Sequence, residues 1–183
     1  MKVKILGSSS SGNCYLLENE NEALVIEGGV SFSEVKKAVD FNISKIVGCL
    51  VSHEHLDHAK YALDFMKAGI PVFCSQGTKE MIGVGLYQPS VCFHGKRFNI
   101  GNWEVMGFDI QHDCHQPFGF LLKQPECGKG LFLTDTFYSE YVFKGLNFIL
   151  VEANYCQHII QENIESGKLH PAIKRRIETS HFS

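Results

Sequence analysis

The chain has 183 residues, of which 44% are hydrophobic and 20% charged, and its formal net charge at pH 7 is -3. This length and composition are typical of a globular protein, which excludes a disordered chain, and we expect one domain over residues 1–183. The small negative charge excludes a protein that holds nucleic acid through an overall basic field.

The chain contains seven cysteines and no Cys-x-x-Cys pair. An odd number without metal-type spacing argues against a disulfide framework and a zinc ribbon, and favours a reducing compartment. The apolar run near Met1 is too short for a signal peptide, and no stretch approaches the ~18 apolar residues that span a bilayer. We therefore expect a cytoplasmic protein that does not associate with a membrane.

Short apolar runs separated by polar turns predict the elements of the first half. Three runs at the start indicate an antiparallel meander, because residues 19–21 form a polar turn between the second and the third. Ser33 is the expected N-cap of the next helix. The β-branched run before His53 indicates a strand buried on both faces. In chain order we expect strands over 3–6, 14–17 and 23–26, a helix over 33–41, a strand over 46–51, a helix over 59–68, a strand over 71–74 and a helix over 75–82.

The second half begins with strands and ends with helices. After Val91 we expect strands over 98–100, 103–110, 118–122 and 131–133, a last buried strand over 147–151, and helices near 156–166 and 171–178. Strand clusters in both halves, separated by helices, fit two sheets packed face to face with helices outside. The predicted fold class is therefore an α/β layered sandwich.

The segment His53-Glu54-His55-Leu56-Asp57-His58 follows the buried strand and carries the clearest chemical signal. Side chains of an extended segment alternate, so His53 and His55 point to the same side and can converge on one ion. Asp57 and His58 lie where the chain turns into a helix and can reach a neighbouring position. Imidazole and carboxylate are favoured ligands of zinc and similar divalent ions, which predicts a metal site. Two metals would need further ligands from distant residues.

Four further residues are candidates for the remaining ligands or for proton transfer. His112 and His115 lie between two predicted strands, and His181 lies near the end of the chain. Asp135 follows the run 130–134, where a strand delivers a side chain to a site at its end. Taken singly, each of these residue types is more often an ordinary surface or capping residue than a ligand.

The order of these motifs resembles the metallo-β-lactamase superfamily over the whole chain. The histidine cluster matches the second motif, Glu27 before a glycine pair matches the first, and His112, Asp135 and His181 match the third, fourth and fifth. The resemblance implies a four-layer αββα sandwich of two mixed sheets. It also implies two divalent metal ions, zinc first and manganese as the alternative, one held by His53, His55 and His112 and the other by Asp57, His58 and His181, with Asp135 bridging.

Within the superfamily the chain is most similar to the small WalJ/YycJ-like branch. This resemblance rests on the serine-rich loop 7–13, the pairs His112-Asp113 and Thr134-Asp135, the triplet Glu152-Ala153-Asn154 and the ending His181-Phe182-Ser183. The chain departs from the family in Glu27, where aspartate is usual, and in stopping two residues after His181. The spacing of the motifs leaves no room for the inserted domain of the β-CASP nucleases.

These features predict a dinuclear metal-dependent hydrolase of the phosphodiesterase or nuclease type, acting on a phosphodiester such as a DNA end. In the expected reaction a metal-bridging hydroxide, oriented by Asp57, attacks phosphorus. His115 is the candidate acid for the leaving group, and a surface loop histidine is its alternative interpretation. The alternatives for the whole protein are a thioester or lactone hydrolase of the same fold and a metal-binding protein with a vestigial site.

Ser11, Asn13 and Asn154 are the predicted substrate-binding residues. The loop 7–13 can offer backbone N–H groups and hydroxyls to a phosphate, although it can also be a flexible turn that packs near the site. The expected partner is a phosphodiester substrate, including nucleic acid. The sequence indicates no particular oligomeric state.

Overall fold

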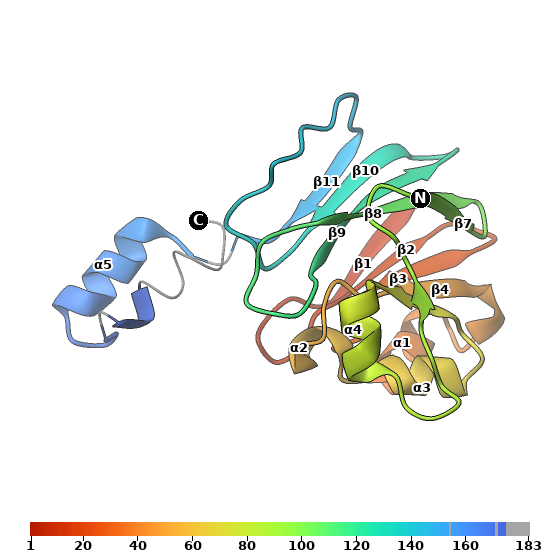
Figure 1. Cartoon of the computed structure of the whole chain (residues 1–183), viewed down its shortest axis with the longest axis horizontal. Coiled ribbons are helices and arrows are strands. Elements are labelled where there is room, and N and C mark those ends of the chain that lie inside the picture. Colours follow the sequence, from red (N-terminus) through yellow and green to blue (C-terminus); the bar gives the residue numbers. More distant parts are fainter. Residues whose placement is uncertain (154, 171, 175–183) are drawn as a thin grey trace.

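The computed structural model describes residues 1–153, 155–170 and 172–174. Within these residues the first sheet has six strands in the order β1-β2-β3-β4-β5-β6 (Figure 1). The antiparallel meander predicted for the start of the chain is confirmed, and three parallel strands extend it. The strands are β1 (Lys2–Gly7), β2 (Cys14–Glu18), β3 (Ala23–Ile26), β4 (Ile46–Leu50), β5 (Val72–Cys74) and β6 (Ser90–Val91).

The second sheet has five strands within the described part of the chain, in the order β11-β10-β9-β8-β7. Its first four members in the sequence form an antiparallel meander, and β11 is added in parallel beside β10. The strands are β7 (Arg97–Ile100), β8 (Trp103–Asp109), β9 (Phe118–Gln124), β10 (Gly128–Leu133) and β11 (Phe148–Val151). Both sheets are therefore mixed, as the family resemblance predicts.

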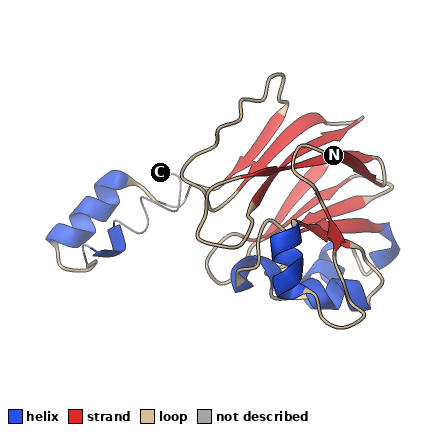
Figure 2. Cartoon of the chain, in the orientation of Figure 1, coloured by secondary structure: helices blue, strands red, loops and turns tan. Residues whose placement is uncertain are grey.

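Most described helices lie on the side of the first sheet (Figure 2). Helices α1, α3 and α4 contact β1, β5 and β6, respectively. Helix α5 lies to one side, apart from both sheets (Figure 1). The helices are α1 (Phe32–Ala38), α2 (Leu56–Ala59), α3 (Ala62–Lys67), α4 (Gln76–Ile82) and α5 (Gln157–Glu165), with a 3-10 turn at Ile43–Lys45. None of the helices over the described ranges is both long and apolar enough to cross a bilayer.

Alternating strand residues separate two large apolar clusters. Leu16 belongs to the cluster that includes Phe65 of α3, whereas its neighbour Leu17 belongs to the cluster that includes Trp103 of the second sheet. This alternation follows from the period of two along a strand, and it makes the first sheet buried on both faces. The layers of helices and of two packed sheets fit the predicted αββα sandwich.

The outer face of the second sheet has a different cover. A third buried cluster lies there, formed by Phe108, Ile110, Leu131 and Leu133. Partly buried Phe143 and Leu146, from the irregular segment 137–147, pack against this cluster. No helix residue of the described chain belongs to this cluster.

The single helix predicted over 59–68 is wrong, because two short helices, α2 and α3, meet at Tyr61. The backbone N–H of Tyr61 donates to Gly28 O at 2.8 Å instead of continuing the helix. The carbonyl of Asp57, which a helix would use at this point, accepts instead from the N–H of Asn13 at 2.7 Å. Contacts with the first sheet's loops therefore interrupt the helical ladder.

Two smaller predictions also need correction. Helix α1 is capped by Ser31 rather than Ser33, because the Ser31 carbonyl accepts the first N–H groups of the helix. The strand predicted to be buried over 147–151 is half-exposed, since β11 is the last strand at its edge of the described sheet: Ile149 is 56% exposed and Val151 is 52% exposed. Of the helix predicted over 171–178, only residues 172–174 are described, and they are helical.

Candidate metal centre

The histidine cluster begins directly after β4, as the sequence predicts. β4 lies between two parallel neighbours, and His53 is fully buried beyond the end of this strand. Ser52 Oγ lies 2.8 Å from His53 Nδ1, so a hydroxyl orients this ring from behind. His55 then forms the N-cap of α2, which places Asp57 and His58 on a helical turn. A strand end followed by a tight helical turn thus brings four donor side chains into a short stretch of backbone.

The second sheet brings two more donors to the same place. His112 lies in the loop between β8 and β9, and Asp135 follows β10. His55 Nδ1 lies 3.1 Å from His53 Nε2 and 3.3 Å from His112 Nε2. Asp135 Oδ2 lies 3.3 Å from His53 Nε2 and 3.8 Å from His112 Nε2. Ring nitrogens that face each other and a carboxylate at these distances can converge on one cation.

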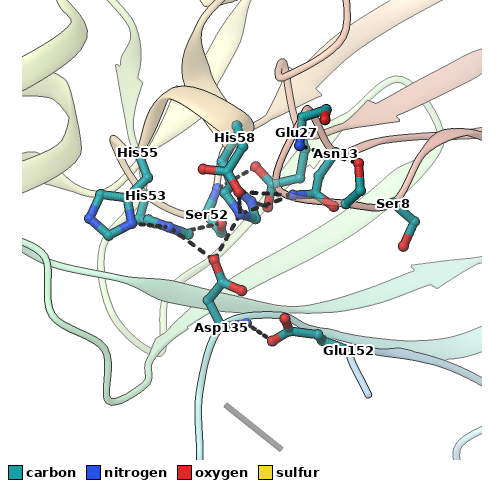
Figure 3. Close-up of polar contacts among 12 residues, drawn as sticks. Ser8, Asn13, Glu27, Ser52, His53, His55, His58, Asp135 and Glu152 are labelled. Carbon is teal, nitrogen blue, oxygen red and sulfur yellow. Dashed lines mark hydrogen bonds and ion pairs between the residues drawn. The ribbon is translucent and has the colours of Figure 1, made fainter. Parts of the chain in front are cut away.

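A second donor group shares Asp135 with the first (Figure 3). His58 Nε2 lies 2.8 Å from Asp135 Oδ2 and 3.4 Å from Asp57 Oδ2. In each group, one donor atom from every residue lies within 4.8 Å of the others; the groups are His53, His55, His112 and Asp135, and Asp57, His58 and Asp135. Mixed imidazole and carboxylate sets of this kind fit zinc and similar divalent ions.

A glycine pair packs against the backbone of the helical turn that carries these donors. Gly28 N donates to His58 O at 2.6 Å, and Asn13 N donates to Asp57 O at 2.7 Å. A Cβ atom at Gly29 would lie 1.7 Å from Asp57 O, so glycine is required for this close approach. The pair therefore fixes the position of the turn, and with it the second donor group.

Glu27 occupies the family's aspartate position and supports the cluster from behind. Its side chain is fully buried, and Oε1 lies 3.5 Å from His58 Nδ1. Its Oε2 accepts a hydrogen bond from the N–H of Ser52 at 3.3 Å. The longer carboxylate therefore contacts both a donor ring and the strand end that precedes His53, and contacts of this kind orient metal ligands.

The two most perturbed histidines of the cluster have opposite electrostatic surroundings. Burial alone would lower the pKa of His58, but the carboxylates of Glu27, Asp135 and Asp57 outweigh burial and raise this pKa to about 12. Burial and the neighbouring His53 lower the pKa of His112 to about 4. A neutral His112 offers a lone pair to a metal, and the carboxylates around His58 favour a divalent cation in place of a proton.

A pocket of about 760 Å³ opens onto both donor groups. Part of its wall is apolar and includes the exposed side chains of Ile5, Ile149 and Val151, which come from edge strands of the two sheets. Among the described residues that line it none is lysine or arginine, whereas four carry a carboxyl group: Asp57, Asp113, Asp135 and Glu152. Within the described part of the chain, an anion in this pocket therefore meets no lysine or arginine side chain.

The structure brings one of the predicted substrate-binding residues to the donors. Asn13 Nδ2 lies 3.1 Å from His58 Nε2 and 3.4 Å from Asp57 Oδ2. Ser11 does not line the pocket, whereas serines 8–10 of the same loop do. Asn13 therefore contacts the donor side chains themselves, and the serine loop borders the pocket through its earlier residues.

The candidate acid His115 lies on the same loop as His112 but outside the pocket lining. Its side chain is 58% exposed, and its Nδ1 lies 2.9 Å from Glu54 Oε1. The same Glu54 oxygen accepts from the backbone N–H of His115 at 2.8 Å. Asn154 and His181 lie outside the described residues, so their roles stay predictions, as does the acid role of His115.

Two contacts within this site escape sequence reasoning. Glu54 ties the loop of His112 to the cluster, and Ser52 orients His53. Both residues stand next to a histidine of the cluster, and this position is the signal that could have singled them out. The partner of Glu54 lies 61 positions further along the chain, so only the fold reveals what it binds.

Known proteins resemble this chain in sequence and in fold. A family model described as the metallo-beta-lactamase superfamily matches residues 9–91. Exodeoxyribonuclease YycJ of Bacillus anthracis is 29% identical over 190 residues, which cover 97% of this chain and 70% of that protein. Exodeoxyribonuclease WalJ of Streptococcus pneumoniae is 26% identical over 199 residues, which cover 100% of this chain and 72% of that protein.

Solved structures show the same fold. The metallo-beta-lactamase fold protein YhfI from Bacillus subtilis has a TM-score of 0.64 at 12% identity, covering 84% of this chain and 71% of that one. Rm3 metallo-beta-lactamase has a TM-score of 0.58 at 17% identity, covering 78% of this chain and 62% of that one. The alignment therefore spans less than two thirds of the Rm3 enzyme, and likeness at this identity speaks for the fold alone.

The family model over residues 9–91, the relatives and the fold all support the metallo-β-lactamase superfamily for this chain. Within the superfamily its similarity lies with the WalJ/YycJ-like branch. Both predictions from the sequence are confirmed. The family and the cluster of histidine and aspartate donors support a metal-dependent hydrolase.

Proposed function

We propose that this chain is a dinuclear metal-dependent phosphodiesterase that removes nucleotides from DNA ends. The observation that carries the proposal is the carboxylate of Asp135, which belongs to both donor groups. A carboxylate shared between two ligand sets can bind two neighbouring divalent ions at once. The names of YycJ and WalJ, both exodeoxyribonucleases, support a DNA end as the substrate.

In this proposal the donors divide between two ions. His53, His55 and His112 would hold one ion, Asp57, His58 and the predicted ligand His181 the other, and Asp135 both. Bound divalent ions supply a nucleophile at neutral pH and stabilise the negative charge that develops on the phosphoryl oxygens. Zinc is the first choice because the first group is rich in imidazole, and manganese is the alternative because the second is rich in carboxylate.

Two side chains have positions that fit proton handling. The carboxylate of Asp57 lines the pocket near Asn13, so it can orient the attacking water and accept its proton. The Nδ1–H of His115 donates to the Glu54 carboxylate at 2.9 Å, which leaves Nε2 for the leaving oxygen. Because His115 lies outside the pocket lining, it can act only on a substrate that extends over the loop edge, as a DNA strand does.

The charges of the pocket make DNA binding depend on metal. The described lining has four carboxylates and no lysine or arginine, so it repels a phosphodiester unless cations are bound. We therefore expect the metal-free chain to bind a DNA end at this pocket far more weakly than the metal-loaded chain.

The seven free cysteines fit a reducing compartment, so we propose that the reaction takes place in the cytoplasm.

The experiment uses the full chain, stripped of metal with a chelator and reloaded with zinc or manganese. We expect the loaded protein to hydrolyse bis-p-nitrophenyl phosphate and to release nucleotides from linear DNA, leaving closed circular DNA intact. Asp135→Ala is the inactive variant, and Glu140→Ala is the matched control on an exposed position of the same segment. Hydrolysis of a thioester alone would overturn the proposal, and two bound metals without any hydrolysis would favour a vestigial site.

A further inference from the structure

The ends of β10 and β11 bring a second carboxylate close to Asp135. The two strands pair in parallel with Leu133 opposite Val151, and the N–H of Glu152 donates to Leu133 O at 3.0 Å. The residues that follow each strand therefore leave the sheet at the same edge. In Figure 3 the Glu152 side chain lies beside the backbone of Asp135, on the opposite side from the histidine rings.

Asp135 adopts an unusual backbone conformation at this edge. Its φ angle is 45°, in the left-handed region that side chains other than glycine rarely occupy. Its N–H donates to Glu152 Oε2 at 2.7 Å, a short hydrogen bond to a charged acceptor. Such conformations persist where surrounding contacts hold them, and the Glu152 carboxylate is such a contact.

This conformation determines where the Asp135 carboxylate points. Asp135 Oδ2 lies 2.8 Å from His58 Nε2 and 3.3 Å from His53 Nε2, so one oxygen faces a ring from each donor group. Rotation of the backbone toward an ordinary extended or helical conformation would move this oxygen away from one or both rings. Glu152 itself belongs to neither donor group.

We propose that Glu152 is a positioning residue that holds the Asp135 backbone, so that the shared carboxylate stays between the two donor groups. The inference rests on the proposed two-metal function. What it adds is the position of one ligand, the carboxylate of Asp135. An uncharged side chain with an oxygen acceptor at position 152 should preserve this geometry, whereas a methyl group should not. Glu152, the first residue of the triplet Glu152-Ala153-Asn154, would thus hold the backbone of a metal ligand.

The test compares metal binding by Glu152→Ala, Glu152→Gln and Glu140→Ala in the full chain. Cobalt(II) titration followed by visible absorption, with equilibrium dialysis of zinc, reports the affinity and the ligand geometry of each equivalent. We expect Glu152→Ala to weaken the second equivalent about 10–100-fold, the range typical for residues that orient metal ligands. We expect Glu152→Gln to stay within about threefold of the original chain because its amide oxygen replaces the acceptor. Glu140→Ala should bind metal unchanged.

Two results would overturn the inference. Unchanged binding of both equivalents by Glu152→Ala would show that Asp135 needs no such support. An equal loss in Glu152→Gln would show that Glu152 acts through its charge rather than as an acceptor. If Glu152→Ala fails to fold, Glu152→Met takes its place, because methionine keeps the length of the side chain but has no oxygen acceptor; the same loss of metal affinity is expected, and unchanged binding would overturn the inference.

Metal binding is read without a nucleic acid, so failure of the inference and failure of the proposed function are distinguishable. In one outcome, Glu152→Ala loses the second metal equivalent while the metal-loaded original chain leaves DNA intact. This pair of results would support the positioning role of Glu152 and reject the nuclease function. If the original chain hydrolyses DNA and Glu152→Ala binds metal normally, the nuclease function is supported and the positioning role of Glu152 is rejected.

Discussion

The two sheets of the sandwich are covered in different ways. The first sheet packs against helices and buries the whole side chain of Phe65 between them. The second sheet packs against the irregular segment 137–147, where Phe143 is only partly buried. Fewer backbone hydrogen bonds hold an irregular segment, so its cover should contribute less to stability than the helices do.

The donors of the metal centre follow the same division. Fully buried His53 and His58 come from one short segment that the first sheet and its helices support. His112 and Asp135 come from loops of the second sheet, and a carboxylate distant in the sequence contacts each of these loops, Glu54 the first and Glu152 the second. His53 and His58 are thus positioned by one continuous segment of the chain. His112 and Asp135 are positioned in part by hydrogen bonds to residues distant in the sequence.

The largest effect should come from removing the donor that both groups share. We expect Asp135→Ala to lose tight binding of two metals and to lower kcat/KM at least about 10³-fold, because it removes several kcal/mol of charge stabilisation. Asp57→Ala should retain one metal because it belongs to a single group. Metal analysis with hydrolysis of bis-p-nitrophenyl phosphate measures both. Two tightly bound metals with full turnover in Asp135→Ala would contradict the shared-ligand scheme.

The two covers can be compared by truncating one ring in each. Phe65→Ala should destabilise the protein by about 3–5 kcal/mol, because a fully buried ring leaves a cavity. Phe143→Ala should cost about 1–2 kcal/mol, because this ring is only partly buried. Urea unfolding of the metal-free proteins measures both free energies. Equal losses would show that the irregular segment supports its sheet as firmly as the helices support theirs.

Removing a tether should have a smaller effect than removing a donor. Glu54→Ala frees the loop of His112 from two hydrogen bonds at His115, and we expect about a 10-fold loss of metal affinity. The same substitution at exposed Glu20 is the control. Isothermal titration with zinc measures the affinity. A Glu54→Ala variant that binds zinc as tightly as the Glu20→Ala variant would mean that the loop keeps its position without this tether.

The smallest expected effect concerns an ion-pair cluster of the first sheet. Burial alone would raise the pKa of Glu18, but Lys4 and Lys45, each at 2.7 Å, outweigh burial and lower it below the ordinary value of 4.5. A lowered folded-state pKa contributes stability above pH 4.5 that disappears as the pH falls through the folded-state value.

Glu18→Gln should therefore be less stable at pH 7 by under about 1 kcal/mol, because one of the two lysines is substantially exposed. Thermal unfolding between pH 3 and pH 8, with the pH range chosen to bracket this titration, should show the difference closing on the acid side. A difference that stays constant across that range would mean that packing, rather than the ion pairs, causes the loss.

Sequence reasoning reached those parts of the molecule that local patterns determine. The strand before His53 and the alternation within the histidine cluster follow from residues next to one another. The break at Tyr61 does not, because it depends on hydrogen bonds to Gly28 and Asn13, which only the folded chain brings near. The left-handed backbone of Asp135 escapes prediction for the same reason, since its supporting acceptor lies on another strand.

Because each donor group draws on both sheets, an ion bound there would act as a cross-link between the two halves of the sandwich. Its binding free energy would add to the free energy of unfolding, by about 4 kcal/mol when the free metal stands at a thousand times its dissociation constant. In the metal-loaded protein, the weaker cover of the second sheet would then lower the stability of the fold least. Metal supply would set not only whether the chain can hydrolyse its substrate, but also how long the chain survives proteolysis.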